Sequence, residues 1–206
     1  MTKKPETVKQ EDLIKRKDSL YYVKDAKVPF TGTSEEFWEN GKLKSKNNYK
    51  SGHLKFSELF YPSGQMQSKE NYKNNECHGF CKYFGEDGQL FLKENYKNGK
   101  LHGPSVWILD GQLRSRENYK NGILHGTSEY FLDCGDFSKG NYKNGKKHGL
   151  FEYFVKDDGD AGRSDGDGDF KSVSKRTYKN GKQDGPSENI NGDFNKIINS
   201  FRNLNS

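Results

Sequence analysis

Four histidines stand before a glycine at regular intervals, and histidine is a common metal ligand. They are His78, His102, His125 and His148. A zinc ion needs several ligands within about 2.3 Å. These histidines lie one sequence repeat apart, which corresponds to about 10 Å in a sheet with two strands per repeat. The spacing excludes a shared zinc site, and we expect a structural role beside a turn, with a pH-sensitive contact surface as the alternative.

Two cysteines, Cys77 and Cys81, flank His78, but their spacing is unlike that of common zinc motifs. Cys134 is the third cysteine of the chain, so any pairing leaves one unpaired. None of the three recurs once per repeat. This pattern argues against a disulfide framework and favours a reducing compartment. The sequence predicts no metal site at these residues.

An acidic segment, residues 157–169, contains Asp165, Asp167 and Asp169 at the 1, 3, 5 spacing of an EF-hand calcium loop. Phe170 stands where that loop has its glycine, and Arg176 where it has its bidentate glutamate. We interpret the segment as a solvated acidic loop inserted into the repeat array. Calcium binding and ordering on contact with a partner are the alternatives.

Catalytic patterns are not apparent in this sequence. It has no glycine-rich phosphate loop and no nucleophile elbow. The one interruption of the repeat is the acidic segment, which has no evident nucleophile or base beside it. We therefore predict a chain that is not an enzyme, with no catalytic residue and no cofactor.

One phrase recurs through the chain, Tyr-Lys-Asn-Gly or a close variant. Its tyrosines are 23 or 24 residues apart, except for a last interval of 36. A period of this length indicates an array of small structural units, none of which can bury its apolar face alone. The tyrosines of the phrase are Tyr49, Tyr72, Tyr96, Tyr119, Tyr142 and Tyr178.

Two turn signals divide each repeat into two short runs rich in aromatic residues. In one repeat the turns are Asp87-Gly88 and Asn98-Gly99, and such dipeptides supply the positive φ angles of β-hairpin turns. Hydrophobic residues make up only 30% of the chain, but aromatic residues make up 14%, which favours a thin aromatic core over disorder. We predict an all-β fold, an elongated single-layer antiparallel sheet of tandem β-hairpins, over residues 20–187.

Alternation along each strand separates two faces. In the strand that ends at Tyr119-Lys120, Glu117 and Tyr119 share one face, while Arg116 and Lys120 share the other. The second face is basic, and we predict partner binding there, with a solvated face that discourages aggregation as the alternative. We expect the tyrosines to pack between neighbouring hairpins. The candidate partner-binding residues are Lys73, Lys97, Arg116, Lys120 and Lys143.

The two ends differ from the repeats, as expected for caps of an array. Residues 1–19 are a charged tail and the start of a capping hairpin that we expect over residues 12–23. Residues 188–206 carry an apolar stripe at helical spacing, which predicts a C-terminal cap helix. A partner-binding or membrane-surface helix is the alternative. The stripe consists of Phe194, Ile197, Ile198, Phe201 and Leu204.

Two segments, residues 31–45 and 95–103, carry the turn and aromatic pattern most completely. They resemble the bacterial variant of the MORN repeat, which is typical of YwqK-type antitoxin or immunity proteins, and the resemblance covers residues 20–187. It implies a β-hairpin repeat fold and binding to a protein partner, including a cognate toxin. Other proteins with such repeats are scaffolds or lipid-associated modules, so scaffolding and peripheral binding to anionic lipid are the alternatives.

The N-terminal residues have no apolar run typical of a signal peptide, and no window has the roughly 18 apolar residues of a membrane span. We therefore expect a cytoplasmic location. The net charge is +6, which permits binding to anionic lipid or nucleic acid without requiring it. No specific nucleic-acid partner is predicted, and the oligomeric state stays open.

Overall fold

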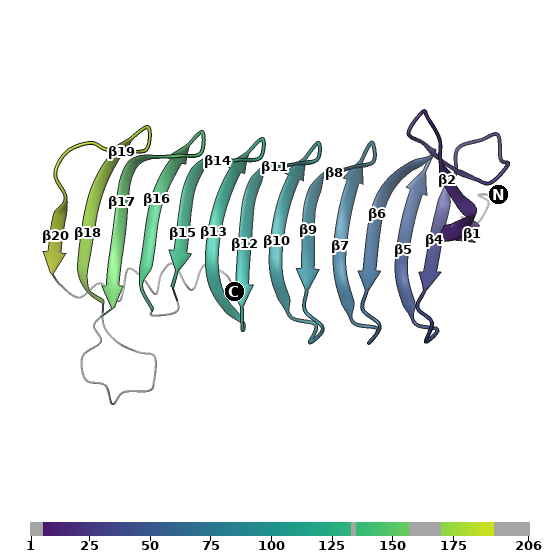
Figure 1. Cartoon of the computed structure of the whole chain (residues 1–206), viewed down its shortest axis with the longest axis horizontal. Coiled ribbons are helices and arrows are strands. Elements are labelled where there is room, and N and C mark those ends of the chain that lie inside the picture. The colour runs from purple at the N-terminus through teal and green to yellow at the C-terminus, as the bar shows by residue number, and fades with distance from the viewer. Residues whose placement is uncertain (1–5, 133–134, 157–169, 192–206) are drawn as a thin grey trace, which may run out of the picture. The chain divides into compact units, whose positions relative to one another are not determined.

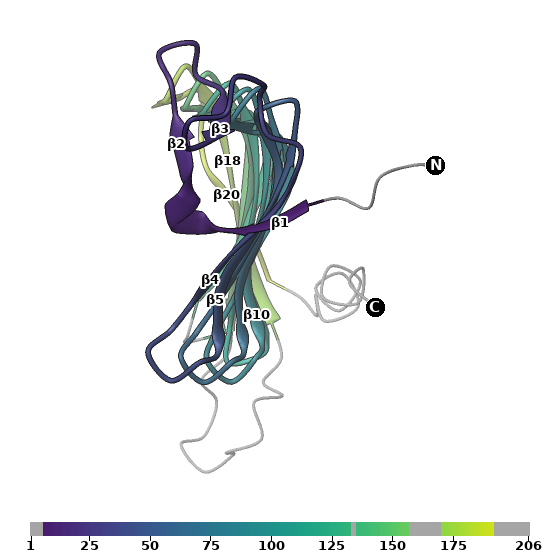
Figure 2. The ribbon, with the colours of Figure 1, turned by 90° about the vertical axis from the view of Figure 1, so that its right-hand side faces the viewer.

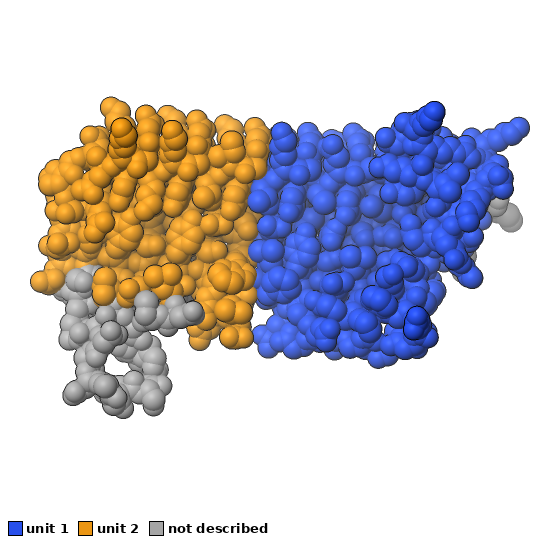
Figure 3. Space-filling model, viewed as in Figure 1, with its two compact units in different colours: residues 1–102 blue, residues 103–206 orange. Residues whose placement is uncertain are grey.

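The computed structural model describes residues 6–132, 135–156 and 170–191 (Figure 1). The chain divides into two compact units, unit 1 with residues 1–102 and unit 2 with residues 103–206 (Figure 3). Both are built from β-strands, and a single 3-10 turn is the only helix within the described ranges. The predicted all-β class and the β-hairpin repeats are therefore confirmed.

Unit 1 begins with a strand, a 3-10 turn and a small hairpin, and continues with three long hairpins. Its elements are β1 (Glu6–Lys9), η1 (Gln10–Asp12), β2 (Leu13–Lys15), β3 (Tyr21–Val23), β4 (Gly32–Phe37), β5 (Leu43–Lys50), β6 (His53–Phe60), β7 (Met66–Lys73), β8 (Glu76–Cys77), β9 (Gly79–Phe84), β10 (Leu90–Lys97) and β11 (Lys100–Leu101).

The sheet of unit 1 is mixed, which corrects the predicted purely antiparallel arrangement. Strands β4 to β11 pair antiparallel along the chain, but β1 pairs parallel with β4, with Glu6 beside Gly32 and Lys9 beside Glu35. A parallel pair needs a long connection between its strands. Residues 10–31 provide it, and residues 6–9, expected to belong to the charged tail, form a strand.

The connection between β1 and β4 covers part of the sheet. Its β2–β3 hairpin forms a separate two-stranded sheet within the region where the sequence predicts a capping hairpin. Figure 2 shows η1 and β2 standing to one side of the sheet. The rings of Tyr21 and Phe30 lie 4.9 and 5.7 Å from the ring of Tyr49, which is buried. This aromatic group joins the N-terminal segment to the first repeat.

Unit 2 contains three long hairpins and a final edge strand, all antiparallel. Its elements are β12 (Gly103–Leu109), β13 (Gln112–Lys120), β14 (Ile123–Leu124), β15 (Gly126–Phe131), β16 (Phe137–Lys143), β17 (Lys146–Lys156), β18 (Phe170–Lys179), β19 (Lys182–Gln183) and β20 (Glu188–Asn191).

The aromatic core of unit 2 joins its last two hairpins. Phe131, Phe137, Phe154 and Val173 are all buried and in contact, and Leu113 packs against them. The ring of Phe137 lies 4.6 Å from that of Phe131 and 5.4 Å from that of Phe154. This cluster is the thin aromatic core that the composition predicts.

The two kinds of turn differ in geometry. The turns of the Tyr-Lys-Asn-Gly phrases have positive φ at both central residues, for example 52° at Asn98 and 71° at Gly99, as a type I′ hairpin turn requires. Most of the other turns are longer loops, in which glycine alone has a positive φ. In one of them Trp38 N–H donates to Lys42 O and Gly41 N–H donates to Trp38 O. Asp110-Gly111 is the exception, with φ of 51° and 71°.

The C-terminal region departs from the prediction where the structure describes it. Residues 188–191, expected at the start of a helix, form the edge strand β20, which pairs with β18. The apolar stripe from Phe194 to Leu204 lies outside the described residues, and so do the acidic segment 157–169 and Cys134.

Candidate functional site

Cross-strand pairing assigns each side chain to one of two faces, because residues directly opposite in a sheet point to the same side. We call one the tyrosine face, since it carries the tyrosine of each Tyr-Lys-Asn-Gly phrase, such as Tyr96 opposite Gly79. The other is the lysine face, on which Lys46 lies opposite Glu35 and Glu58. The faces predicted from strand alternation are those that the pairing produces.

Four of the predicted partner-binding residues occupy equivalent positions on the lysine face. Lys73 and Lys97 end β7 and β10 in unit 1, and Lys120 and Lys143 end β13 and β16 in unit 2. All four side chains are exposed. None of them forms an ion pair with another described residue. We call these four residues the strand-end lysines.

Arg116, the fifth predicted residue, has a different environment. Its Nη1 lies 2.7 Å from Oε2 of Glu129 on the neighbouring strand, and Glu129 is only 6% exposed. A buried carboxylate needs this partner, because an unpaired buried charge is costly. The structure therefore separates Arg116 from the strand-end lysines and assigns it a stabilising ion pair.

The tyrosines of the repeats have a polar role in addition to packing. Tyr72 donates a hydrogen bond to Glu70, and Tyr96 donates to Glu94 at 2.8 Å. In unit 2 Glu117 accepts from both Tyr119 and Tyr130, at 2.7 and 2.8 Å. Sequence reasoning missed these carboxylates, although the recurring order Glu-Asn-Tyr-Lys places glutamate and tyrosine on one face of a strand.

Burial, together with these hydrogen bonds, holds the tyrosine hydroxyls in their protonated form. Burial raises the pKa of Tyr72, Tyr96 and Tyr130 well above the ordinary value, and the bond to a glutamate raises it further. The hydroxyls therefore act as donors at neutral pH. Their arrangement stabilises the tyrosine face, whereas the exposed strand-end lysines lie on the lysine face.

The recurring histidines lie beside turns, as predicted. His78 Nδ1 accepts a long hydrogen bond of 3.5 Å from Asn98 N–H, and His125 Nδ1 accepts an equivalent one from Asn144 N–H. His78 and His125 thus contact the turn of the following hairpin, whereas Nδ1 of His102 and of His148 has no hydrogen-bond partner among the described residues. Within the described ranges, no three or more His, Cys, Asp or Glu side chains come together in a way that suits a metal ion.

Cys77 and Cys81 are free thiols in unit 1. Cys81 is fully buried, and burial raises the pKa of its thiol to about 12. Burial also raises the pKa of the Cys77 thiol. Both are therefore thiols rather than reactive thiolates at neutral pH.

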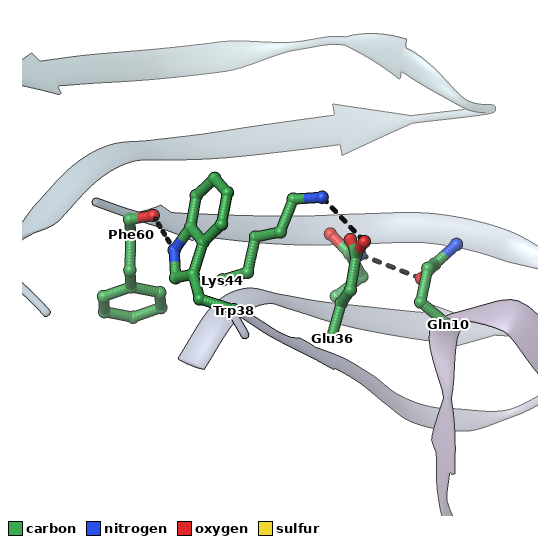
Figure 4. Close-up of polar contacts among 6 residues, drawn as sticks. Gln10, Glu36, Trp38, Lys44 and Phe60 are labelled. Carbon is green, nitrogen blue, oxygen red and sulfur yellow. Dashed lines mark hydrogen bonds and ion pairs between the residues drawn. The ribbon is translucent and has the colours of Figure 1, made fainter. Parts of the chain in front are cut away.

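A hollow of about 310 Å³ lies in unit 1 where η1 approaches the sheet (Figure 4). Its charged groups bind each other, since Lys44 Nζ lies 2.8 Å from Glu36 Oε1 and 5.0 Å from the ring centre of Trp38. Trp38 Nε1 donates to Phe60 O at 3.0 Å. The charged groups and the tryptophan N–H of the hollow therefore already have partners. It is lined by Gln10, Glu36, Trp38, Lys44, Ser45, Asn47, Leu59, Phe60 and Gln67.

Repeated hairpins, one hydrogen-bonded face and one lysine-bearing face define a tandem β-hairpin repeat protein. Three segments of unit 1, residues 30–51, 57–74 and 78–98, match the family of the MORN repeat variant. The MORN-repeat part of the predicted resemblance is thus supported. Comparison with curated proteins finds no match. Among the described residues, no helix has the length and apolarity that a membrane crossing requires.

Proposed function

We propose that this chain is a non-catalytic, protein-binding repeat module of the antitoxin or immunity type, which neutralises a partner toxin by binding to it. The observation that carries the proposal is the set of strand-end lysines, which are exposed at equivalent positions and form no ion pair with the rest of the described chain. The match to the MORN repeat variant supports an interaction module. The antitoxin role itself rests on the resemblance of the repeats.

The lysine positions favour an acidic partner. Within a unit, equivalent lysines are two strands apart, which is about 10 Å and close to the Debye length of about 8 Å at physiological salt. Their fields therefore add without strong mutual repulsion. Such a surface speeds association with a partner of opposite charge and rejects partners of like charge.

Binding is favoured over catalysis by the state of the polar groups. In the described parts of unit 1, the tyrosine hydroxyls discussed above donate to glutamates, and the two thiols have raised pKa values. A general base or nucleophile needs the opposite arrangement, a group whose pKa suits proton transfer or attack. The exposed strand-end lysines lie instead on the lysine face.

Co-expression tests this function. The product of each neighbouring gene is expressed alone and together with this chain, and growth of the host is measured. Rescue of growth, with a one-to-one complex on size-exclusion chromatography, is the expected result. Replacing Lys73, Lys97, Lys120 and Lys143 by glutamate should abolish rescue. A complex that forms without any growth effect would instead favour the scaffold alternative.

Peripheral binding to anionic lipid is the second candidate function. It is favoured by two pairs of lysines that lie directly opposite each other near the turns, Lys97 with Lys100 and Lys143 with Lys146. Each lysine near an anionic membrane contributes about 1 kcal/mol. Sedimentation with phosphatidylserine vesicles measures this activity. Binding that is lost at high salt and absent with neutral vesicles would support it.

A further inference from the structure

One row of residues crosses the lysine face of unit 1 from strand to strand. Each member lies directly opposite the next in the pairing register. In order along the sheet, the row consists of Glu35, Lys46, Glu58, Lys69, Lys82 and Lys93. Acidic and basic residues alternate from Glu35 to Lys69, and Lys69 is the first of three consecutive lysines.

The three consecutive lysines are not a general property of this fold. The equivalent row of unit 2 alternates without a break through Arg116, Glu129, Lys139, Glu152, Lys175 and Glu188. Like charges directly opposite each other destabilise a sheet. In this row, unit 1 therefore keeps a costly arrangement that the equivalent row of unit 2 avoids.

The outer two lysines have neighbours that compensate them in part. Lys69 Nζ lies 3.3 Å from Glu58 Oε1 and 5.0 Å from the ring centre of Phe56. Lys93 Nζ lies 4.7 Å from the ring centre of Phe80, which is 44% exposed. Each contact draws an ammonium group toward an aromatic ring.

Lys82, between them, is exposed, and no other described residue forms an ion pair with it. The centre of the row thus combines a free ammonium group with two partly compensated ones and an exposed aromatic side chain. A surface of this kind complements a segment that carries negative charge beside an apolar group.

We propose that Lys69, Lys82 and Lys93 form a binding site for carboxylate side chains in an acidic segment of a protein partner. A carboxylate over Lys82 restores the alternation that the rest of the row shows, as in the Lys46–Glu35 pair at 3.3 Å. Phe80 contributes apolar contact beside it. The inference rests on the proposed protein-binding function, but it assigns recognition to a site other than the strand-end lysines.

Two variants of Lys82 test the site. The probe is a fluorescein-labelled octaglutamate peptide with one central tyrosine, and its binding to the full chain is measured by fluorescence anisotropy. Lys82→Glu should weaken binding about tenfold or more, which corresponds to the loss of one well-placed charge contact. Lys82→Met should have a smaller effect of the same sign. Both variants should also raise the thermal unfolding temperature, because they relieve the repulsion within the row.

The matched control is Lys182→Glu in unit 2. Lys182 is exposed and lies opposite Lys179, so its reversal changes the net charge by the same amount and also removes a like-charged pair. It should leave peptide affinity nearly unchanged. Equal losses in Lys182→Glu and Lys82→Glu would overturn the site, because net charge alone would then explain binding. A lower unfolding temperature for both Lys82 variants would overturn it as well.

Two further results separate this site from its rivals. If Lys82→Glu abolishes binding to phosphatidylserine vesicles but leaves binding to the peptide unchanged, the row is a membrane-binding site and the proposal is overturned. In the co-expression assay, Lys82→Glu should impair rescue of growth. If the strand-end lysine variant loses rescue and Lys82→Glu retains it, the protein-binding function stands and this inference fails.

Discussion

The hairpins of unit 1 and the last two hairpins of unit 2 are stabilised in different ways, while Glu117 of unit 2 accepts the same kind of tyrosine bond as unit 1. In unit 1 the tyrosine face carries hydrogen bonds, from Tyr72 to Glu70 and from Tyr96 to Glu94. In unit 2 the last two hairpins bury Phe137 and Phe154 in an aromatic cluster. Nearby, Lys147 Nζ lies between 4.8 and 5.4 Å from three aromatic ring centres. A thin sheet can thus be stabilised either by paired polar groups or by rings.

The lysine faces show the reverse difference. Unit 2 neutralises its cross-strand row, with Arg116 bound to Glu129 and Lys175 lying 3.2 Å from Glu152. In unit 1, Lys82 lies between two other lysines, and no residue within the described ranges forms an ion pair with it. The charge pattern on this face can therefore differ between units without changing the fold. A charge that has no counterpart in the row is therefore a candidate for binding a partner.

The largest expected effect comes from the aromatic cluster of unit 2. Phe137→Ala should reduce the free energy of unfolding by about 3–5 kcal/mol, because it leaves a cavity at a side chain that is only 1% exposed. Urea denaturation measures the change. The control is Phe91→Ala in unit 1, where the side chain is 39% exposed and the cost should stay within about 0.5 kcal/mol. Equal costs would contradict the assignment of the core.

The next prediction compares two basic residues of the cross-strand rows. Arg116→Met should cost about 3 kcal/mol, because it leaves the buried Glu129 carboxylate without its partner. Lys82→Met should change the unfolding free energy by a few tenths of a kcal/mol in the stabilising direction. Denaturation at low and high salt measures both. A destabilising effect at Lys82 would remove the contrast between the units.

A smaller effect is expected at the tyrosine–glutamate bonds. Tyr96→Phe should cost about 1.5 kcal/mol, because a hydrogen bond to the carboxylate of Glu94 is lost. Tyr119→Phe should cost less, since Glu117 keeps Tyr130 as a second donor. Thermal unfolding of the two variants measures the difference. A larger cost at Tyr119 would show that the second bond does not compensate for the first.

The last prediction concerns titration of the tyrosines, which changes the free energy of unfolding only at alkaline pH. The folded state raises the pKa of Tyr72 and Tyr96, mainly through burial and then through the bond to glutamate. Above pH 10 the unfolded chain loses these protons while the folded chain keeps them. The contribution of these tyrosines to the free energy of unfolding should therefore be fully present below that pH. Above it, the free energy of unfolding should fall by up to about 1.4 kcal/mol per pH unit for each tyrosine.

The alkaline decline can be assigned by substitution. Tyr96→Phe should make the fall in unfolding free energy above pH 10 less steep, as measured by urea denaturation at several pH values. Tyr178 in unit 2 serves as the contrast, because its hydrogen bond with Tyr153 lowers its pKa. Replacing Tyr178 by phenylalanine should not reduce the slope. An unchanged slope in Tyr96→Phe would show that this tyrosine does not carry the pH dependence.

Local features of the fold could be predicted from the residues themselves. Asn98-Gly99 forms a type I′ turn because both residues tolerate positive φ, and this needs no distant contact. Other local details were open to misreading. Asn75 stands where the phrase has glycine, which looks like erosion of the repeat. In the structure its side chain accepts from Leu54 N–H at 2.7 Å and donates to Ser19 O at 2.6 Å.

Long-range features could not be predicted in this way. The parallel pairing of β1 with β4 brings Gln10 to Asn47, where its Oε1 accepts a hydrogen bond of 3.1 Å. Nothing in the spacing of these residues indicates the contact, because the connection between them is long and irregular. Arg116 was grouped with the strand-end lysines because alternation assigns a face but does not identify the residue on the next strand.

The sequence alone determined the hairpins, the turns and the two faces of this protein, because each depends on the conformational preferences of neighbouring residues. Only the tertiary structure decided which charges meet across strands. Bulges shift the register within individual hairpins, for example between Asn48 and Tyr49, so repeat spacing cannot be converted into a pairing. For this reason only the paired strands show that Lys82 lies between two lysines and that Arg116 binds Glu129.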